Sequence, residues 1–118
     1  MGREWKFYTT EGGSCPIRKE MDKCKLNRFE KAKLRTLMER VRLRQTHQGD
    51  VKSLGGDLLE VRLDGDHRIF RLLYAEEEGG LVLLALSFFQ KKTQATPPVQ
   101  KLTANRRLKD WRNRSPEG

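Results

Sequence analysis

The sequence has few of the residues from which metal centres and disulfide frameworks are built. Its 118 residues include only two cysteines, Cys15 and Cys24, and two histidines, His47 and His67. Two cysteines alone make neither a disulfide framework nor a zinc site, and two histidines are too few for a typical histidine-built hydrolytic site. A P-loop, a GxGxxG motif and a Gly-x-Ser-x-Gly motif are also missing. We therefore expect no metal and no cofactor, and a site built from arginine, lysine and tyrosine.

Long apolar segments are missing as well. No run of ~18 apolar residues is present that could span a membrane, and no apolar stretch follows Met1 as it would in a signal peptide. From these absences we expect a cytoplasmic protein with reduced thiols and no membrane partner. The length predicts a single domain over residues 1–118.

Acidic residues are in the minority. Lysine and arginine total 25 against 16 aspartates and glutamates, which gives a formal net charge of +9 and a pI near 9.9. A surplus of this size on a small protein favours polyanionic partners, with nucleic acid ahead of a membrane surface. The alternative interpretation is a densely charged, solvated surface of the kind common in thermophilic proteins.

The densest apolar sequence lies between Leu58 and Pro98 and predicts a small sheet. Apolar and polar residues alternate before and after Asp64-Gly65-Asp66, which is typical of half-buried strands joined by a hairpin in which glycine supplies a positive φ. A nearly continuous apolar segment then predicts a central strand buried on both faces. The three predicted strands are residues 59–63, 68–74 and 81–89.

The flanking segments predict one more strand and three helices. A first strand is expected over residues 5–10, a short helix after Pro16, and a longer one from Asn27 to Arg44 with Glu30 completing a capping box. Thr96 is expected to cap a last helix that begins at Pro97. The order β-α-α-β-β-β-α predicts an α+β fold with a small antiparallel sheet of about four strands. We expect the helical hairpin and the C-terminal helix to cover one face and to leave the other open and cationic.

Cations are concentrated on the predicted strands and at their ends. This set comprises Arg62, Arg68, Arg71, Lys91 and Lys92, with Tyr74 beside them. Arg62 and Arg71 interrupt apolar strands, so each needs either an acidic partner, such as Glu60 or Asp66, or an anionic ligand. Clustered guanidinium and ammonium groups can stabilise a pentavalent phosphorane during RNA cleavage. A lysine held among other cations has a lowered pKa and can then accept a proton near neutral pH.

Three segments, LLEVRL, FRLLY and LVLLALSFFQKKTQATP, resemble the strand motifs of the HigB-like, phage-derived branch of the RelE/ParE toxin superfamily. The similarity extends from Leu54 to about Trp111, and Lys-Lys-Thr-Gln-x-Thr-Pro is its most specific part. The resemblance implies the toxin of a type II toxin–antitoxin system, a ribosome-dependent mRNA endonuclease that uses the ribose 2′-OH as nucleophile without a metal. It also implies a small antitoxin with a helix-turn-helix domain as partner.

The resemblance assigns expected roles to individual residues. Arg62 and Arg71 would bind the scissile phosphate, and Lys91 or Lys92 would act as general base or phosphate clamp. One of these two neighbours is expected to face away from the site, because successive strand residues point to opposite faces. The expected substrate-binding residues are Arg68, Phe89, which would stack on a base, and Lys33 and Arg40 on the basic helix, which with the C-terminal helix would meet ribosomal RNA. Tyr74 is expected to be structural.

Some positions depart from the family pattern. Ser87-Phe88 stands where many relatives have His-Gly, so no histidine can assist proton transfer there. Phe70 and Ala95 replace a common tyrosine and a common lysine. Because the same fold hosts other activities, inhibition of DNA gyrase without catalysis, or simple nucleic-acid binding, stays open as an alternative. A basic structural protein of phage origin is a third alternative.

Overall fold

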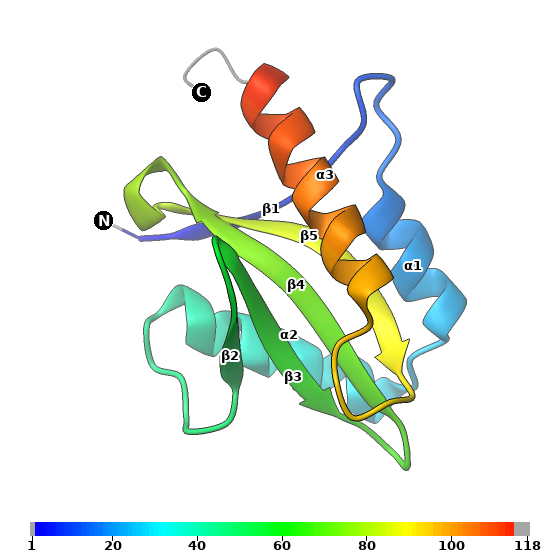
Figure 1. Cartoon of the computed structure of the whole chain (residues 1–118). Coiled ribbons are helices and arrows are strands. Elements are labelled where there is room, and N and C mark those ends of the chain that lie inside the picture. Colours follow the sequence, from blue (N-terminus) through cyan, green and yellow to red (C-terminus); the bar gives the residue numbers. More distant parts are fainter. Residues whose placement is uncertain (1, 115–118) are drawn as a thin grey trace.

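The computed structural model describes residues 2–114, which form three α-helices, one short 3₁₀ turn and one five-stranded sheet (Figure 1). The elements in chain order are β1 (Glu4–Phe7), α1 (Pro16–Cys24), α2 (Arg28–Arg42), β2 (Val51–Gly55), β3 (Leu58–Asp64), β4 (Ile69–Glu77), η1 (Glu78–Gly80), β5 (Val82–Lys91) and α3 (Pro98–Arg114). The predicted α+β class, the helical pair after the first strand and the C-terminal helix are confirmed. None of the helices in the described residues is both long and apolar enough to cross a membrane.

The sheet differs from the prediction in strand number and in the direction of one pair. Its order is β1-β5-β4-β3-β2, and β1 runs parallel to β5 while the other pairs are antiparallel. The additional strand, β2, is short and largely exposed, and its pairing with β3 has a register shift between Ser53 and Gly55. Its sequence has little apolar alternation, so the strand was not predicted. The parallel pair is possible because the helical hairpin and three strands separate β1 from β5 along the chain, and parallel pairing needs such a long connection.

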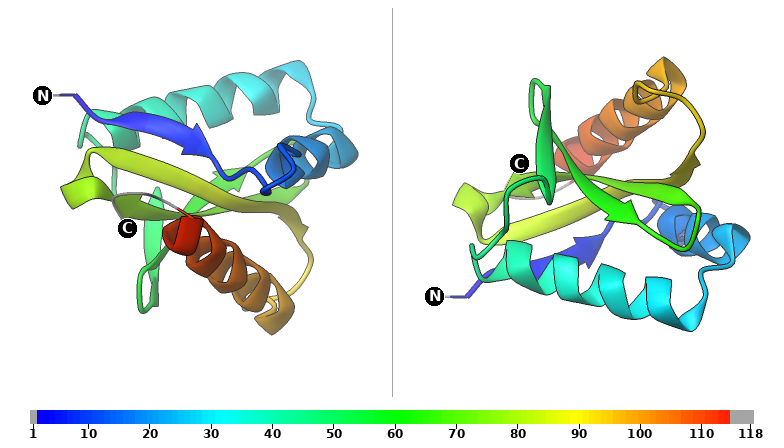
Figure 2. Two further views of the ribbon diagram at one scale, coloured as in Figure 1. Left: turned by 90° about the horizontal axis from the view of Figure 1, so that it is seen from above. Right: turned by 90° about the horizontal axis from the view of Figure 1, so that it is seen from below.

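The helices cover both faces of the sheet, and the expectation that they share one face is wrong. Figure 2 shows α1 and α2 on one side of the sheet and α3 on the other. The reason is visible in the burial of the two central strands: residues 70–75 of β4 and 82–89 of β5 are all buried. Strands buried on both faces need a cover on each side, and a single helical layer cannot supply it.

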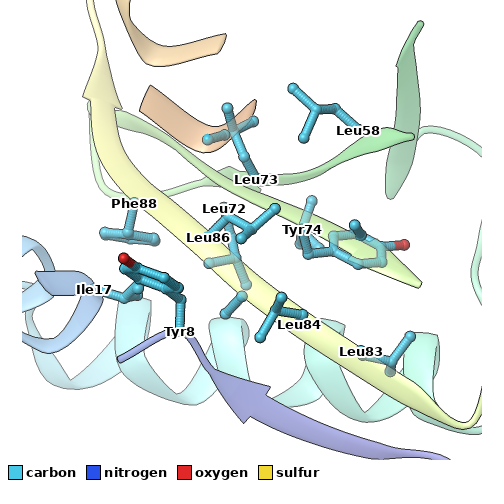
Figure 3. Packing of buried hydrophobic residues seen from close by; sticks show 14 of the residues in the cluster. Tyr8, Ile17, Leu58, Leu72, Leu73, Tyr74, Leu83, Leu84, Leu86 and Phe88 are labelled. Carbon is cyan, nitrogen blue, oxygen red and sulfur yellow. The ribbon is translucent and has the colours of Figure 1, made fainter. Parts of the chain in front are cut away.

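The core is therefore divided into two layers. On the α1–α2 side, Phe70 stacks on Phe88 with ring centroids 5.8 Å apart, next to the fully buried Ile17 of α1. On the other side, Leu58 and Leu73 point toward α3, as Figure 3 shows. Burial of each such side chain contributes about 2 kcal/mol to folding, so both core layers stabilise the packing of the helices on the sheet.

Two helix starts show how local signals and tertiary contacts compete. The capping box at α2 is confirmed: Asn27 and Glu30 exchange both backbone-to-side-chain hydrogen bonds, at 2.8 and 3.0 Å. At α3 the prediction is wrong, because the helix begins at Pro98 and the hydroxyl of Thr96 donates to Glu60 of β3 instead of capping it. Thr96 thus connects the β5–α3 loop to the sheet.

Candidate functional site

Three neighbouring strands bring the predicted cations together. Arg62 of β3 lies opposite Arg71 of β4, and Arg71 lies opposite Phe89 of β5. Lys91 follows two residues later at the end of β5, on the same face as Phe89. The paired residues of β2 and β3 end at Val61, and the amide of Arg62 donates to the carbonyl of Asp50, just before β2, at 2.9 Å.

These cations line a pocket of about 480 Å³ at the end of the sheet where the β5–α3 loop leaves it. Figure 1 shows this loop at the same end as the β3–β4 turn. The lining residues are Arg62, Ile69, Arg71, Lys91, Lys92, Thr93 and Gln94. All four predicted catalytic residues therefore border one pocket, including both Lys91 and Lys92, because Lys92 already belongs to the loop and not to the strand.

Arg71 is the best-defined member of this pocket. Its side chain is 3% exposed, its Nη1 donates to the carbonyl of Phe70 at 2.9 Å, and its Nε lies 3.5 Å from Oε1 of Glu60. Asp64 is more distant, at 3.8 Å from Nη1. Burial lowers the pKa of the Arg71 guanidinium, and Arg62 lowers it further, while Glu60 and Asp64 oppose the change. Arg71 thus has one of the two acidic partners considered from the sequence, Glu60.

Arg62 behaves differently. It is exposed, and within residues 2–114 no carboxylate lies close enough to form an ion pair with it. Asp66, the other acid considered as a partner, is near His67 at 3.6 Å. Arg62 thus faces the pocket with its charge uncompensated, which is the arrangement that an anionic ligand would complete.

The surroundings of Lys91 favour its neutral form. Burial lowers the pKa of its ammonium group, and the neighbouring charges of Arg71, Arg62 and Lys52 lower it further, opposed by Glu60. Each cation destabilises the protonated amine, so a larger fraction is neutral than for a free lysine at the same pH. A neutral amine beside two arginines can accept a proton while the arginines hold an anion.

Two predicted substrate-binding residues have other positions. Arg68 donates to the carbonyls of Cys24 and Lys25, at 3.0 and 3.2 Å, and to Glu30, and its guanidinium covers the Phe70 ring. It ties the α1–α2 connection to β4 on the face away from the pocket. Phe89 is 7% exposed, so its ring belongs to the core and cannot stack on a base in this conformation.

Lys33 and Arg40 lie in a second pocket of about 360 Å³ between α2, the segment before β2, and β3. The Nζ of Lys33 donates to the carbonyl of Asp64 at 2.8 Å, and Arg40 pairs with Asp50 at 3.3 Å. Arg62 lines this pocket too, so it joins the second pocket to the first. The two pockets thus share Arg62, and the second also contains the carboxylates of Asp50 and Asp64.

An apolar pocket of about 400 Å³ between α1 and α2 was not anticipated. Its lining residues are Phe7, Met21, Asp22, Lys25, Leu26, Lys31, Leu34, Arg35 and Met38. Both helices carry amphipathic patterns, but these patterns predict a buried stripe and not a gap between two stripes. Only the spacing of the helices in the fold creates it.

Residues 2–114 contain no group of three or more histidine, cysteine, aspartate or glutamate side chains placed to hold a metal ion.

The chain is similar to one protein family and to two curated proteins. Residues 21–109 match the family described as "Phage derived protein Gp49-like (DUF891)". Two curated proteins, each named "Probable endoribonuclease HigB1", from Mycobacterium tuberculosis strains CDC 1551 / Oshkosh and ATCC 25618 / H37Rv, are 34% identical to the chain over 109 residues. This alignment covers 92% of the chain and 84% of each relative.

Proposed function

This chain belongs to the phage-derived Gp49-like protein family, and on that premise we propose that it is the toxin of a type II toxin–antitoxin system that cleaves mRNA on the ribosome. The observation that carries the proposal is the pocket in which Arg62, Arg71, Lys91 and Lys92 meet. The name of the mycobacterial relatives, probable endoribonuclease, supports the same class of reaction.

The proposed reaction is an internal transesterification that uses side chains of this pocket and solvent water. The neutral amine of Lys91 removes the proton of a ribose 2′-OH, and the 2′-oxygen attacks the adjacent phosphorus. Arg62 and Arg71 stabilise the additional negative charge of the phosphorane. The bond to the 5′-oxygen of the next nucleotide then breaks, this oxygen takes a proton from solvent water, and the ammonium group of Lys92 holds the phosphate. The products are a 2′,3′-cyclic phosphate and a 5′-hydroxyl, and no metal ion takes part.

The surrounding surface suits a long RNA substrate. The second pocket, with Lys33 and Arg40, continues the basic surface along which the flanking strand would lie. Exposed cations on α2 and α3 would contact ribosomal RNA, where phosphate contacts position the protein without reading sequence. A small helix-turn-helix antitoxin is the proposed protein partner. The apolar pocket between α1 and α2, with Lys25, Lys31 and Arg35 at its rim, would fit an apolar segment with acidic flanks.

The test is cleavage of a defined mRNA by the purified protein in a reconstituted translation system, followed by primer extension. Wild-type protein should give discrete cuts that require ribosomes, and the combined Arg71→Ala, Lys91→Ala and Lys92→Ala variant should give none. A control with Lys6→Ala, Lys19→Ala and Lys23→Ala removes the same charge from exposed positions outside the pocket and should retain the cuts. Loss of the cuts in both variants would assign the effect to net charge alone.

The non-enzymatic alternative is favoured by one observation, the near-complete burial of Arg71 and Phe89. If those side chains only support the fold, the protein would bind nucleic acid or inhibit DNA gyrase without cutting RNA. Intact mRNA together with inhibition of gyrase-catalysed supercoiling would select this alternative.

A further inference from the structure

Glu60 is a fully enclosed acid in the middle of a basic surface. Its side chain is 1% exposed, and it lies on β3 two residues before Arg62. A buried carboxylate is costly unless it is paired and hydrogen-bonded. Both carboxylate oxygens of Glu60 therefore need a positively charged or hydrogen-bonding partner.

Both carboxylate oxygens have such a partner. Oε2 accepts a hydrogen bond from the hydroxyl of Thr96, and Oε1 lies 3.5 Å from Nε of Arg71. Among the buried side-chain nitrogen and oxygen atoms of residues 2–114, Arg71 Nε alone has no hydrogen-bond partner. The edge of the guanidinium that carries Nε is thus turned toward Glu60, at a distance slightly too long for a hydrogen bond.

Thr96 extends this connection to the loop that closes the pocket. Within the loop, the hydroxyl of Thr93 donates to the carbonyl of Ala95 at 2.7 Å, so the segment between Lys92 and Thr96 is compact. Its far end is held by Thr96 on Glu60, 36 positions away in sequence. One carboxylate therefore fixes both the arginine and the loop that carries Lys92.

We propose that Glu60 is a positioning residue of the candidate site, which orients Arg71 through one oxygen and anchors the Lys92–Thr96 loop through the other. The proposal rests on the proposed function for its catalytic consequence, but its structural part stands on the contacts of Glu60 alone.

The charge of Glu60 also has an electrostatic role at Lys91. The charges that shift the Lys91 pKa most are those of Arg71 on β4, Arg62 and Glu60 on β3, and Lys52 on β2, and Glu60 is the negative one of these four. It opposes the lowering of the Lys91 pKa that burial and the three cations produce. Removal of its charge should lower the Lys91 pKa further.

Two substitutions separate the positional role from the electrostatic one. Glu60→Gln keeps the shape and an oxygen for Thr96 but removes the charge. Thr96→Val keeps the charge but breaks the link to the loop, and Thr96→Ser restores the link as a matched control. The first measurement is an NMR titration of the Lys91 side chain, which needs no activity, and the second is the pH dependence of mRNA cleavage at saturating protein.

We expect Glu60→Gln to move the Lys91 titration to lower pH, and Thr96→Val to leave it in place. We expect Thr96→Val to reduce the maximal cleavage rate about tenfold or more without weakening RNA binding, because a small misplacement of reacting groups is costly, and Thr96→Ser to retain activity. An unchanged Lys91 titration in folded Glu60→Gln protein would overturn the electrostatic role. Full activity of Thr96→Val would overturn the positional role. If wild-type protein cuts no RNA, the proposed function fails and the inference on Lys91 is still decided by the titration.

Discussion

Arg62 and Arg71 are register partners on neighbouring antiparallel strands, so two permanent positive charges lie directly opposite each other. Like charges in this relationship destabilise a sheet. Glu60 lies close to Arg71, whereas Arg62 is exposed and has no ion pair in residues 2–114. The free protein therefore keeps an unfavourable contact that an anionic ligand would relieve.

Substitution of Arg62 should thus raise stability and lower function together. We expect Arg62→Gln to increase the free energy of unfolding by about 0.5 kcal/mol, a rise in melting temperature of about 2 °C. The same change should weaken binding of an RNA whose 2′-hydroxyls are blocked. It should also make the slope of log affinity against log salt concentration shallower by about one, the value of one lost phosphate contact. Thermal unfolding and fluorescence anisotropy measure the two effects. A less stable Arg62→Gln protein would show that Arg62 has a structural partner.

The two adjacent lysines should respond differently to replacement by arginine. Arginine keeps the charge but is not deprotonated near neutral pH, so Lys91→Arg should reduce cleavage by about 100-fold or more. Lys92→Arg should retain most of the activity, since an ammonium and a guanidinium group can both hold a phosphate. The cleavage assay with each single variant makes the comparison. An equal loss of cleavage activity in both variants would contradict the assignment of Lys91 as the general base.

The pH profile gives an independent check on Lys91. The active form of a general base is the neutral amine, so the rate should rise with pH until Lys91 is deprotonated. Because burial and the neighbouring Arg71 lower this pKa, the rise should occur at lower pH than for an ordinary lysine. Lys91→Arg should abolish this limb of the profile, and a limb that persists would belong to another group.

Gly65 is predicted to tolerate no side chain. A Cβ at this position would lie 2.9 Å from both Cδ and Cγ of Glu30 and closer still to Oε2, and the Glu30 carboxylate is buried and accepts hydrogen bonds from the Asn27 and Asp66 amides and from Arg68. We expect Gly65→Ala to cost about 1–3 kcal/mol of folding free energy. Gly12→Ala is the matched control, because its nearest contact beyond its chain neighbours would be Thr10 Oγ1 at 3.9 Å. Denaturant unfolding of the two variants decides the point, and equal stability would contradict the close approach.

Glu30 should make folding sensitive to acid. Burial by itself raises the pKa of this carboxyl, but the amide of Asn27, the Arg68 guanidinium and the amide of Asp66 together hold it below its usual value. A lowered folded-state pKa means that the stabilisation is present above the unfolded-state pKa of about 4.3 and is lost as the pH falls through the folded-state value.

Glu30→Gln should therefore destabilise the protein at pH 7 by about 3 kcal/mol, because Arg68 loses its buried partner, and should flatten the loss of stability below about pH 5. The exposed Glu11→Gln should leave both the stability at pH 7 and the acid limb nearly unchanged. Denaturant unfolding at a series of pH values measures both. A variant with the same acid limb as the wild type would place the titrating group elsewhere.

Sequence reasoning succeeded where the signal is local or lies in a motif. The Asn27–Glu30 capping box and the alternating strands β3 and β4 were predicted because the residues involved are close in sequence. The HigB-like resemblance carried by the three strand motifs is confirmed by the family match and by the mycobacterial relatives. The convergence of Arg62, Arg71, Lys91 and Lys92 on one pocket agrees with the expectation, and their catalytic roles stay a prediction.

Sequence reasoning failed where several structures satisfy the same local sequence pattern. In the β3–β4 turn, Gly65 was expected to supply the positive φ, but His67 does so with φ 61°, and Gly65 is instead required by the approach of Glu30. Arg68, a suitable phosphate ligand by its chemistry, is used to join α1, α2 and β4. The open-edge strand β2 has too little apolar alternation to be distinguished from a loop.

The sequence by itself determined the three helices, four of the five strands, the basic character of the protein and the family to which it belongs, because periodicity and motifs are set by residues near one another in the chain. Only the tertiary structure decided which helix covers which face of the sheet, that Arg71 is buried against Glu60, and that Thr96 anchors the pocket loop. Those contacts join residues far apart in sequence, and their free energy comes from desolvation and charge pairing that exist only after the strands have come together.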